Sequence, residues 1–465
     1  MTISLDTSWA SSSEIAQAVG SGQTTATAVV ERALGVIAAR NPALNAFTTV
    51  TAERARAKAR AVDATADKTK LPLAGVPFAV KNLFDIEGLA TVAGSKINRA
   101  HPPATQDQPL IARLEEAGAV LVGALNMGEY AYDFTGENVH DGPSRNPHDL
   151  TCMTGGSSGG SGAAVAGGLV PLTLGSDTNG SIRVPSSLCG IFGLKPTYGR
   201  LTRARSFPFV ASLDHLGPFA RSVPDLAVAY DVMQGPDAED PVCDQRETDF
   251  VTPQLKVGLD GLRIAVAGGY FRQGAFPEAL TALERVAKAL GATRDVDVPE
   301  AARARAAAYV ISCTEGAALH HERLRKQAGD FDPAVRDRLL AAAMVPSTLV
   351  VQAQKFRRWY RTQMLELFKS VDVILAPATP CTAPEIGQQT FVLDGVELPV
   401  RANLGIYTQP ISFIGLPVVA VPVPLSPMPI AVQVIAAPWR EDVALRVAFA
   451  LEQMGVCAAP RPALS

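Results

Sequence analysis

TGGSSGGSGAAVAGGLVPLTLGSDTNGSIRVP, residues 154–185, is the stretch on which the prediction of the fold depends. Glycines and serines fill residues 155–162, small residues follow over 163–169, and an apolar run at 171–175 predicts a strand. Apolar segments flank the glycines closely, which argues against a flexible linker. A phosphate-binding loop would end in Gly-Lys-Ser/Thr, whereas the next lysine is Lys195. The glycines therefore indicate a place where backbones and a substrate approach closely.

Strands and helices are predicted on both sides of this stretch. Their alternation along the chain is typical of an α/β fold whose sheet is covered on both faces. Because we find no internal repeat and no convincing linker, the sequence predicts a single domain over residues 1–465. The strands are expected at 73–80, 119–123, 171–175, 261–267, 371–377 and 418–421, and the helices at 25–37, 51–66, 110–118, 163–169, 277–290 and, almost without interruption, 301–368.

Composition limits the classes of function. The 42 Lys and Arg residues against 45 Asp and Glu give a net charge of −3, which argues against a nucleic-acid surface. The six cysteines show no Cys-x-x-Cys spacing and suggest buried thiols in a reducing compartment. Residues 1–18 lack the pattern of an export signal, and no apolar run is long enough to span a membrane. We expect a cytoplasmic protein that contacts no membrane and, with no cluster of metal-ligand residues, needs no metal or cofactor.

Two serines in the glycine-rich region are candidate nucleophiles. Residues 155–159 match Gly-x-Ser-x-Gly around Ser157, but none of the six histidines stands in a context that would complete a Ser-His-Asp triad. Ser181 follows a predicted strand and a turn of small residues, whose backbone N–H groups suit an oxyanion site. Without an assigned histidine, the candidate base is Lys81 at the end of the strand at 73–80.

A lysine can act as a base only if its pKa falls well below the reference value of about 10.4. Burial in an apolar wall lowers that pKa, because it disfavours the charged form. Ser157 could then relay a proton from Ser181 to Lys81 and return it to the leaving amine. Taken one at a time, Lys81 also fits a surface lysine at a strand end and Ser181 a turn serine, so these residues alone leave the assignment open.

The chain resembles the amidase signature family in residues 75–82, 155–161, 175–185 and 193–200, and the similarity runs along essentially its whole length. The resemblance implies an amidase signature fold, with a central mixed β-sheet covered by helices on both faces, and hydrolysis of linear C–N bonds. It implies N-terminal helices at about 1–70, a signature core at about 71–220 and a helical substrate-site region at about 300–370. By motif position the catalytic set is Lys81, Ser157 held by a cis peptide bond and the nucleophile Ser181, with an oxyanion hole at Thr178, Asn179 and Gly180.

Further site residues follow from the same resemblance. Asp177 and Arg183 are expected to form a structural ion pair. By similarity to the glutamine site of the tRNA amidotransferase, Arg338 would hold a substrate carboxylate, with Tyr309 and His320 as further contacts. Arg338 equally fits a solvated helix charge, and His320 more often a helix histidine with satisfied hydrogen bonds.

At position 179 the chain departs from the family's common Asp-Thr-Gly-Gly-Ser motif, because Asn179 replaces the first glycine. Asparagine tolerates left-handed backbone angles better than most residues, so the loop can persist. Alternatively its side chain contacts the substrate. The two interpretations are compatible, and the sequence does not choose between them.

Within the family, residues 132–138, 142–149, 206–218 and 435–439 resemble the carboxybiuret hydrolases of s-triazine and cyanuric acid degradation. This finer resemblance implies that carboxybiuret is converted to urea-dicarboxylate and ammonia. It also implies a small helical accessory subunit, similar to the small subunit of the tRNA amidotransferase, and a homodimer or heterotetramer. The alternatives are the glutaminase subunit of a glutamyl-tRNA amidotransferase and a catalytically silent scaffold subunit.

Overall fold

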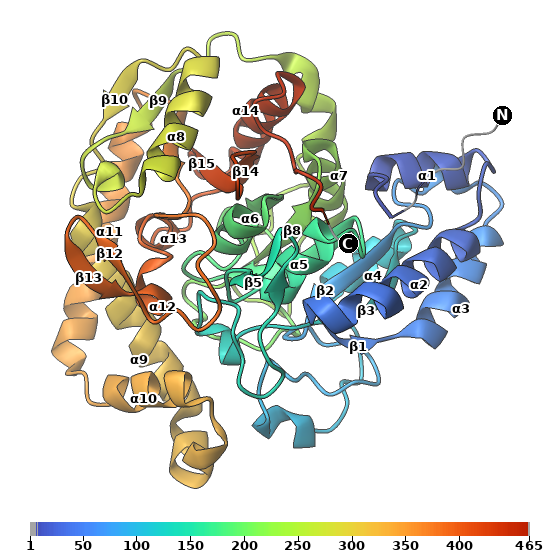
Figure 1. The fold of residues 1–465 in the computed structure, drawn as a ribbon, viewed down its shortest axis with the longest axis horizontal. Helices are drawn as coiled ribbons and strands as arrows, with labels where there is room; N and C mark the ends of the chain where they lie inside the picture. The colour runs from blue at the N-terminus through green and yellow to red at the C-terminus, as the bar shows by residue number, and fades with distance from the viewer. Residues whose placement is uncertain (1–5, 7, 464–465) are drawn as a thin grey trace.

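A computed structural model of the chain describes residue 6 and residues 8–463 (Figure 1). Among these residues, eleven strands form one mixed sheet in the order β1-β3-β2-β6-β8-β7-β14-β15-β11-β9-β10. The strands are β1 (Phe47–Val50), β2 (Pro77–Lys81), β3 (Val120–Leu125), β6 (Leu172–Asp177), β7 (Phe192–Lys195), β8 (His215–Ala220), β9 (Ile264–Ala267), β10 (Arg294–Val296), β11 (Val373–Pro377), β14 (Val418–Val423) and β15 (Ile430–Ala436). Two hairpins lie outside it, β4 (Arg145–Asn146) with β5 (Asp149–Met153) and β12 (Thr390–Leu393) with β13 (Val396–Pro399).

Helices surround the sheet, those of the N-terminal quarter on one side of the view and α9 to α11 on the other (Figure 1). Contacts join α3, α4 and α5 to the strands of the first half, and α8 and α14 to those of the second. The helices are α1 (Ser12–Gly20), α2 (Ala26–Leu44), α3 (Ala52–Asp63), α4 (Pro109–Glu116), α5 (Gly159–Ala166), α6 (Arg183–Cys189), α7 (Val223–Met233), α8 (Pro277–Ala289), α9 (Ala301–Gln327), α10 (Pro333–Ala342), α11 (Ser347–Leu367), α12 (Val400–Asn403), α13 (Gln409–Ser412) and α14 (Glu441–Gln453). Short 3-10 helices lie at Lys68–Lys70, Ile97–Ala100, Glu129–Ala131, Thr252–Val257, Gly269–Arg272 and Ala328–Asp330.

The central strands are buried along their whole length. Every residue of β2, β3, β6, β8, β11, β14 and β15 is buried, which explains why these strands are continuous apolar runs with no alternation of polar residues. Strands β2 and β6 run parallel, with Val80 opposite Leu174. Their C-terminal ends therefore meet at one edge of the sheet, and this brings Lys81 close to the segment that carries Ser181.

The predicted α/β fold is confirmed, and most predicted elements lie within a few residues of their expected ends. Two helices differ more: α2 was expected to end at residue 37 and continues to Leu44, and α5 begins at Gly159, whereas the small-residue helix was expected from residue 163. The first turn of α5 needs glycine, since a Cβ at Gly160 would lie 2.5 Å from the carbonyl oxygen of Ala46. The expected helical stretch 301–368 is divided into α9, α10 and α11 by two short turns.

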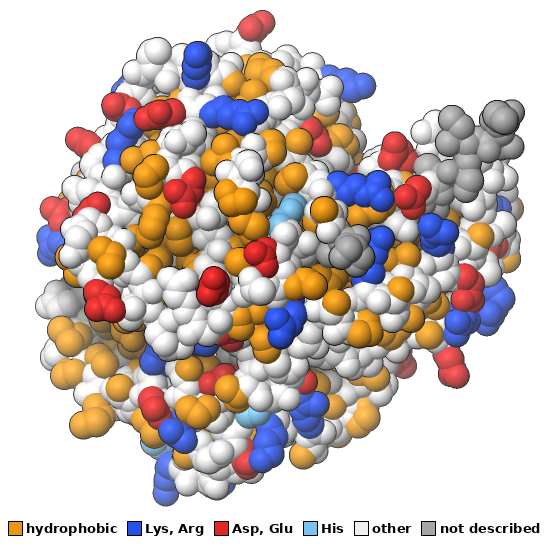
Figure 2. Space-filling view, viewed as in Figure 1, with side chains coloured by type: hydrophobic (Ala, Val, Ile, Leu, Met, Phe, Trp, Pro, Cys, Tyr) orange, Lys and Arg blue, Asp and Glu red, His pale blue; other side chains and the backbone are white. Residues whose placement is uncertain are grey.

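All six cysteines are buried and free. Within the described part of the chain no single helix is long and apolar enough to cross a membrane; α10 and α11 pass that test only as a pair, bent by 95°. On the face displayed in Figure 2, basic and acidic side chains are interspersed. The prediction about an export signal concerns residues 1–18, of which 1–5 and 7 lie outside the described residues.

Candidate active site

The glycine-rich segment is a point of close backbone contact. A Cβ at Gly156 would lie 2.3 Å from the Asp133 carboxylate, so only glycine fits there. The peptide bond between Gly156 and Ser157 is cis, as the resemblance implied. Ser157 is fully buried and lies two residues before the start of α5. The interpretation of the tract as a place where backbones approach closely is therefore confirmed.

Lys81 ends β2 with its side chain inside the protein. Its exposed fraction is 0%, and its Nζ donates to Ser157 Oγ at 2.7 Å and to Ser176 Oγ at 2.9 Å. Burial lowers the pKa of Lys81 to about 7, although the carboxylates of Asp214 and Asp177 act in the opposite direction. An amine with this pKa is partly neutral at physiological pH and can accept a proton.

The loop from Thr178 to Ser181 joins β6 to α6 and presents backbone donors. Within the described residues, no backbone N–H group from Thr178 to Ser181 donates to a protein acceptor. Gly180 has a φ of 144°, and a Cβ there would lie 2.2 Å from Thr408 Oγ1. The Thr408 hydroxyl also donates to the carbonyl oxygen of Asn179 at 2.7 Å, which fixes the loop. Unpaired N–H groups on a fixed loop beside a serine can stabilise an oxyanion.

A buried ion pair holds both ends of this loop. Arg183 Nε and Nη2 each donate to a different oxygen of Asp177 at 3.0 Å, and both side chains are inaccessible to solvent. Arg183 also donates to the carbonyl oxygen of Thr408 at 3.1 Å and to Gln433 Oε1 at 2.7 Å. Although burial acts against it, the Arg183 guanidinium keeps the pKa of Asp177 well below its usual value. The predicted structural ion pair is confirmed.

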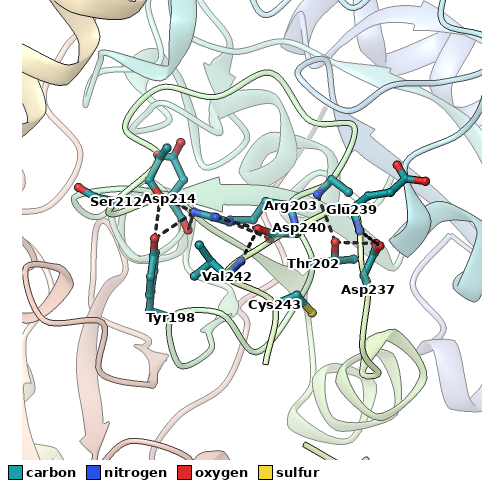
Figure 3. A network of polar contacts seen from close by, with 12 residues as sticks. Tyr198, Thr202, Arg203, Ser212, Asp214, Asp237, Glu239, Asp240, Val242 and Cys243 are labelled. Atoms are coloured by element: carbon teal, nitrogen blue, oxygen red, sulfur yellow. Dashed lines mark hydrogen bonds and ion pairs between the residues drawn. The ribbon is translucent and has the colours of Figure 1, made fainter. Parts of the chain in front are cut away.

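A second set of hydrogen bonds holds the loop from Thr178 to Ser181. Asp214 accepts the Thr178 hydroxyl at 2.6 Å, and burial raises the pKa of this carboxyl. Figure 3 shows Arg203 between Asp240 and the pair Tyr198 and Asp214. Its guanidinium donates to Asp240 at 3.0 Å and to the hydroxyl of Tyr198 at 3.3 Å. The position of Thr178 thus depends on residues far along the chain.

One pocket opens onto this loop and brings together most of the predicted substrate residues. Asn179, Ser181, Tyr309 and Arg338 all line it. Arg338 stacks on the Tyr132 ring, with its guanidinium carbon 3.8 Å from the ring centroid, and donates to the Tyr132 carbonyl oxygen. The remaining lining residues are Ala131, Tyr132, Asp133, Phe134, Thr178, Phe209, Ser312, Arg401, Ala402 and Gln409.

His320 does not line the pocket. Its ring packs 4.0 Å from the Tyr130 ring, centroid to centroid, and also against Phe207 and Phe331. Burial lowers its pKa to about 3, and neither ring nitrogen has a hydrogen-bond partner. His320 is therefore a neutral, enclosed imidazole on α9, the helix that also carries Tyr309.

Sequence reasoning missed several residues of the site. Ser176, the second acceptor for Lys81, stands in the quoted motif, and its place at the end of the strand could have identified it. Arg401 has no such signal, because it follows a hairpin remote in sequence; it pairs with Asp133, and with Glu137 at 3.0 Å. Ser312 and Gln409 reach the pocket only through the packing of their helices.

A histidine-based triad and a metal site receive no support. Among the described residues the pocket lining includes no histidine, and His215, the nearest along the chain to Ser181 after the loop, is buried with its Nδ1 2.9 Å from the carbonyl oxygen of Asp177. No three His, Cys, Asp or Glu side chains within residue 6 and residues 8–463 are grouped so that they could hold a metal ion.

Comparison with known proteins agrees with this geometry. The family described as amidase matches residues 28–445. The chain belongs to the amidase family. As a member of that family it hydrolyses C–N bonds of amides, as the sequence predicted.

The chain is 52% identical to AtzE, a 1-carboxybiuret hydrolase subunit of Pseudomonas sp. (strain ADP), over 95% of this chain and 98% of that protein. It is 36% identical to a glutamyl-tRNA(Gln) amidotransferase subunit of Roseiflexus sp. (strain RS-1), over 95% of this chain and 96% of that protein. A solved structure, described as an unexpected vestigial protein complex revealing the origins of an s-triazine catabolic enzyme, superposes with a TM-score of 0.96 at 52% identity, covering 97% of this chain and 100% of that one.

Proposed function

We propose that this chain hydrolyses the terminal amide of a small carboxylated ureide, namely carboxybiuret, and releases ammonia and urea-dicarboxylate. The observation that carries the proposal is the hydrogen bond between Lys81 and Ser157 near the loop of Ser181, whose backbone N–H groups have no acceptor among the described residues and which lines the same pocket as Arg338. The 52% identity to a carboxybiuret hydrolase subunit supports the choice of substrate.

In the proposed mechanism, Ser181 Oγ attacks the terminal carbonyl carbon. Its proton passes to Ser157 Oγ while Ser157 gives its own proton to neutral Lys81 Nζ, 2.7 Å away. The negative charge that develops on the carbonyl oxygen is stabilised by backbone N–H groups of Thr178, Asn179, Gly180 and Ser181. Catalysis thus uses donors fixed before the substrate arrives.

The proton then returns along the same path to the leaving nitrogen. Breaking the C–N bond releases ammonia and leaves an acyl group on Ser181 Oγ. Water attacks this ester, with Lys81 and Ser157 again taking its proton, and the product leaves as a carboxylate. Water supplies the oxygen and the two hydrogens needed for ammonia and the new carboxylate.

Arg338 is proposed to receive the substrate carboxylate. The Tyr132 carbonyl and ring hold one side of its guanidinium, so the group is oriented before binding. Tyr309 and Arg401 also line the pocket, and Arg401 is already paired with Asp133 and Glu137. His320 is proposed only as a support for the pocket lining.

Ammonia release from carboxybiuret, biuret, allophanate, malonamate and glutamine tests the proposal. Carboxybiuret should be preferred, and Ser181→Ala should abolish turnover together with labelling by a serine-reactive fluorophosphonate. Ser186→Ala is a matched control, because the Ser186 hydroxyl lies on α6, is buried and has no partner. Retained ammonia release in Ser181→Ala would contradict the catalytic set.

Other outcomes would favour the alternatives. Preference for glutamine would favour a glutaminase subunit, for which the 36% identity to a glutamyl-tRNA(Gln) amidotransferase subunit is the supporting observation. Failure of the fluorophosphonate to label the native protein would favour a silent scaffold.

We further propose a single domain that works in the cytoplasm with a small helical partner subunit. One sheet draws strands from both halves of the chain, and free buried cysteines suit a reducing compartment. Large apolar side chains are exposed on α11, among them Val351 (53%) and Leu349 (51%), and in the turn before it, where Met344 is 84% exposed. If the chain instead forms a homodimer through this surface, sedimentation velocity should show a dimer that Leu349→Glu with Met344→Glu dissociates.

A further inference from the structure

The amide oxygen of Asn179 is a buried acceptor without a partner in the wall of the pocket. Asn179 lines the pocket, and its Oδ1 accepts no hydrogen bond from any residue that the structure describes. A buried polar atom left unpaired costs about 1–3 kcal/mol, so such atoms usually have a purpose. Here the atom belongs to a residue two positions before Ser181.

The backbone does not explain why asparagine stands at this position. Asn179 is not among the residues with a positive φ; the left-handed position of the loop is Gly180, with a φ of 144°. The tolerance of asparagine for left-handed angles is therefore unused. The reason for this side chain must lie in its amide group.

The orientation of that amide group is fixed by its other end. Asn179 Nδ2 donates to Ser312 Oγ at 2.9 Å. Ser312 donates its single hydroxyl proton to the carbonyl oxygen of Ala308 at 2.8 Å, so its oxygen can only accept from Asn179. The backbone of Asn179 is held by Thr408, which donates to its carbonyl oxygen. The amide therefore keeps Nδ2 on Ser312 and leaves Oδ1 as an acceptor.

We propose that Asn179 Oδ1 accepts the N–H next to the scissile carbonyl, so that Asn179, oriented by Ser312, selects ureides over ordinary carboxamides. The inference rests on the proposed function, because Ser181 places the scissile carbonyl near residue 179. A ureide carries N–H on the acyl side of that carbonyl, whereas a carboxamide such as glutamine carries CH₂. A methylene would leave Oδ1 unpaired, and a site built to pair N–H discriminates strongly against an analogue that lacks it.

Two stable probes differ only in this group. Hydantoate has CH₂–NH–CO–NH₂ where succinamate has CH₂–CH₂–CO–NH₂, and both carry one carboxylate. Their ability to protect Ser181 from the fluorophosphonate is measured, since protection does not require turnover. In the native protein hydantoate should protect at a concentration about tenfold or more below that of succinamate.

Two variants distinguish a loss of the preference for hydantoate from a loss of binding to both probes. Asn179→Ala should weaken protection by hydantoate alone and bring the two probes within about threefold. Ser312→Ala, which frees the amide to rotate, should reduce the preference while still allowing labelling. Equal protection in the native protein, protection by neither probe, or a parallel loss for both in Asn179→Ala would overturn the inference. Turnover of carboxybiuret is scored separately and decides the proposed function.

Discussion

Lys81 makes the pH dependence of the reaction predictable. A fall in its pKa from 10.5 to about 7 corresponds to about 5 kcal/mol between the charged and neutral forms. With a pKa of about 7, roughly half of the lysine is neutral at pH 7 and about 1% at pH 5. With an unshifted pKa of 10.5, about 0.03% would be neutral at pH 7. The burial of Lys81 thus raises the population of the active base more than a thousandfold.

The expected profile of kcat/KM therefore falls about tenfold per pH unit below pH 7 and is level above about pH 8. The assay is ammonia release from carboxybiuret between pH 5 and 9. Lys195 is a matched control, because burial lowers its pKa to about 7 as well, but its Nζ donates to the carbonyl oxygen of Pro196, and it does not line the pocket.

Lys195→Met should keep the inflection near pH 7, and Lys81→Met should lose it together with a factor of about 10²–10⁴ in rate. A flat profile between pH 5 and 9, or a rate still rising tenfold per unit at pH 9, would refute a buried lysine base. An inflection that disappears in Lys195→Met would transfer the role to the other lysine.

Three further outcomes are expected. Arg183→Met leaves the Asp177 carboxylate buried and unpaired, which should lower the free energy of unfolding by about 3–5 kcal/mol in urea titrations; an unchanged midpoint would show that the pair carries no such role. In Arg338→Lys the new side chain cannot stack on the Tyr132 ring or bind a carboxylate with two donors. The KM for carboxybiuret should therefore rise about 10- to 100-fold, while the KM for neutral biuret should change little. An equal rise in both KM values would indicate that the substitution disturbs the whole pocket. Because the folded-state pKa of Lys81 is depressed, the unfolded chain binds more protons than the native protein between about pH 7 and 10.5. The native protein should therefore gain stability over this range relative to Lys81→Met, by at most about 5 kcal/mol. Parallel stability curves would argue against the shift.

The amino-acid sequence alone was enough to predict the fold class and six of the eleven strands of the main sheet, and its resemblance to the amidase signature family indicated the three residues of the proposed catalytic set. Buried parallel strands need continuous apolar residues, and these runs can be recognised without coordinates. Lys81, Ser157 and Ser181 stand within contiguous motifs, because each is held by the strand end or glycine turn beside it in the sequence. The cis peptide and the Asp177–Arg183 pair were expected from the resemblance to the amidase signature family, and the structure contains both.

Which residues line the pocket could be seen only in the folded structure. Arg401, Ser312 and Gln409 enter the pocket from segments with no motif, because the packing of α9, α12 and α13 places them there. His320 was a candidate on the correct helix but lies on its inner face, among aromatic rings. The two interpretations of Asn179 also separated only with coordinates, since a φ angle and an unpaired oxygen are properties of the folded chain. Local sequence determines strands and turns, whereas the lining of a pocket depends on contacts between residues distant in the sequence.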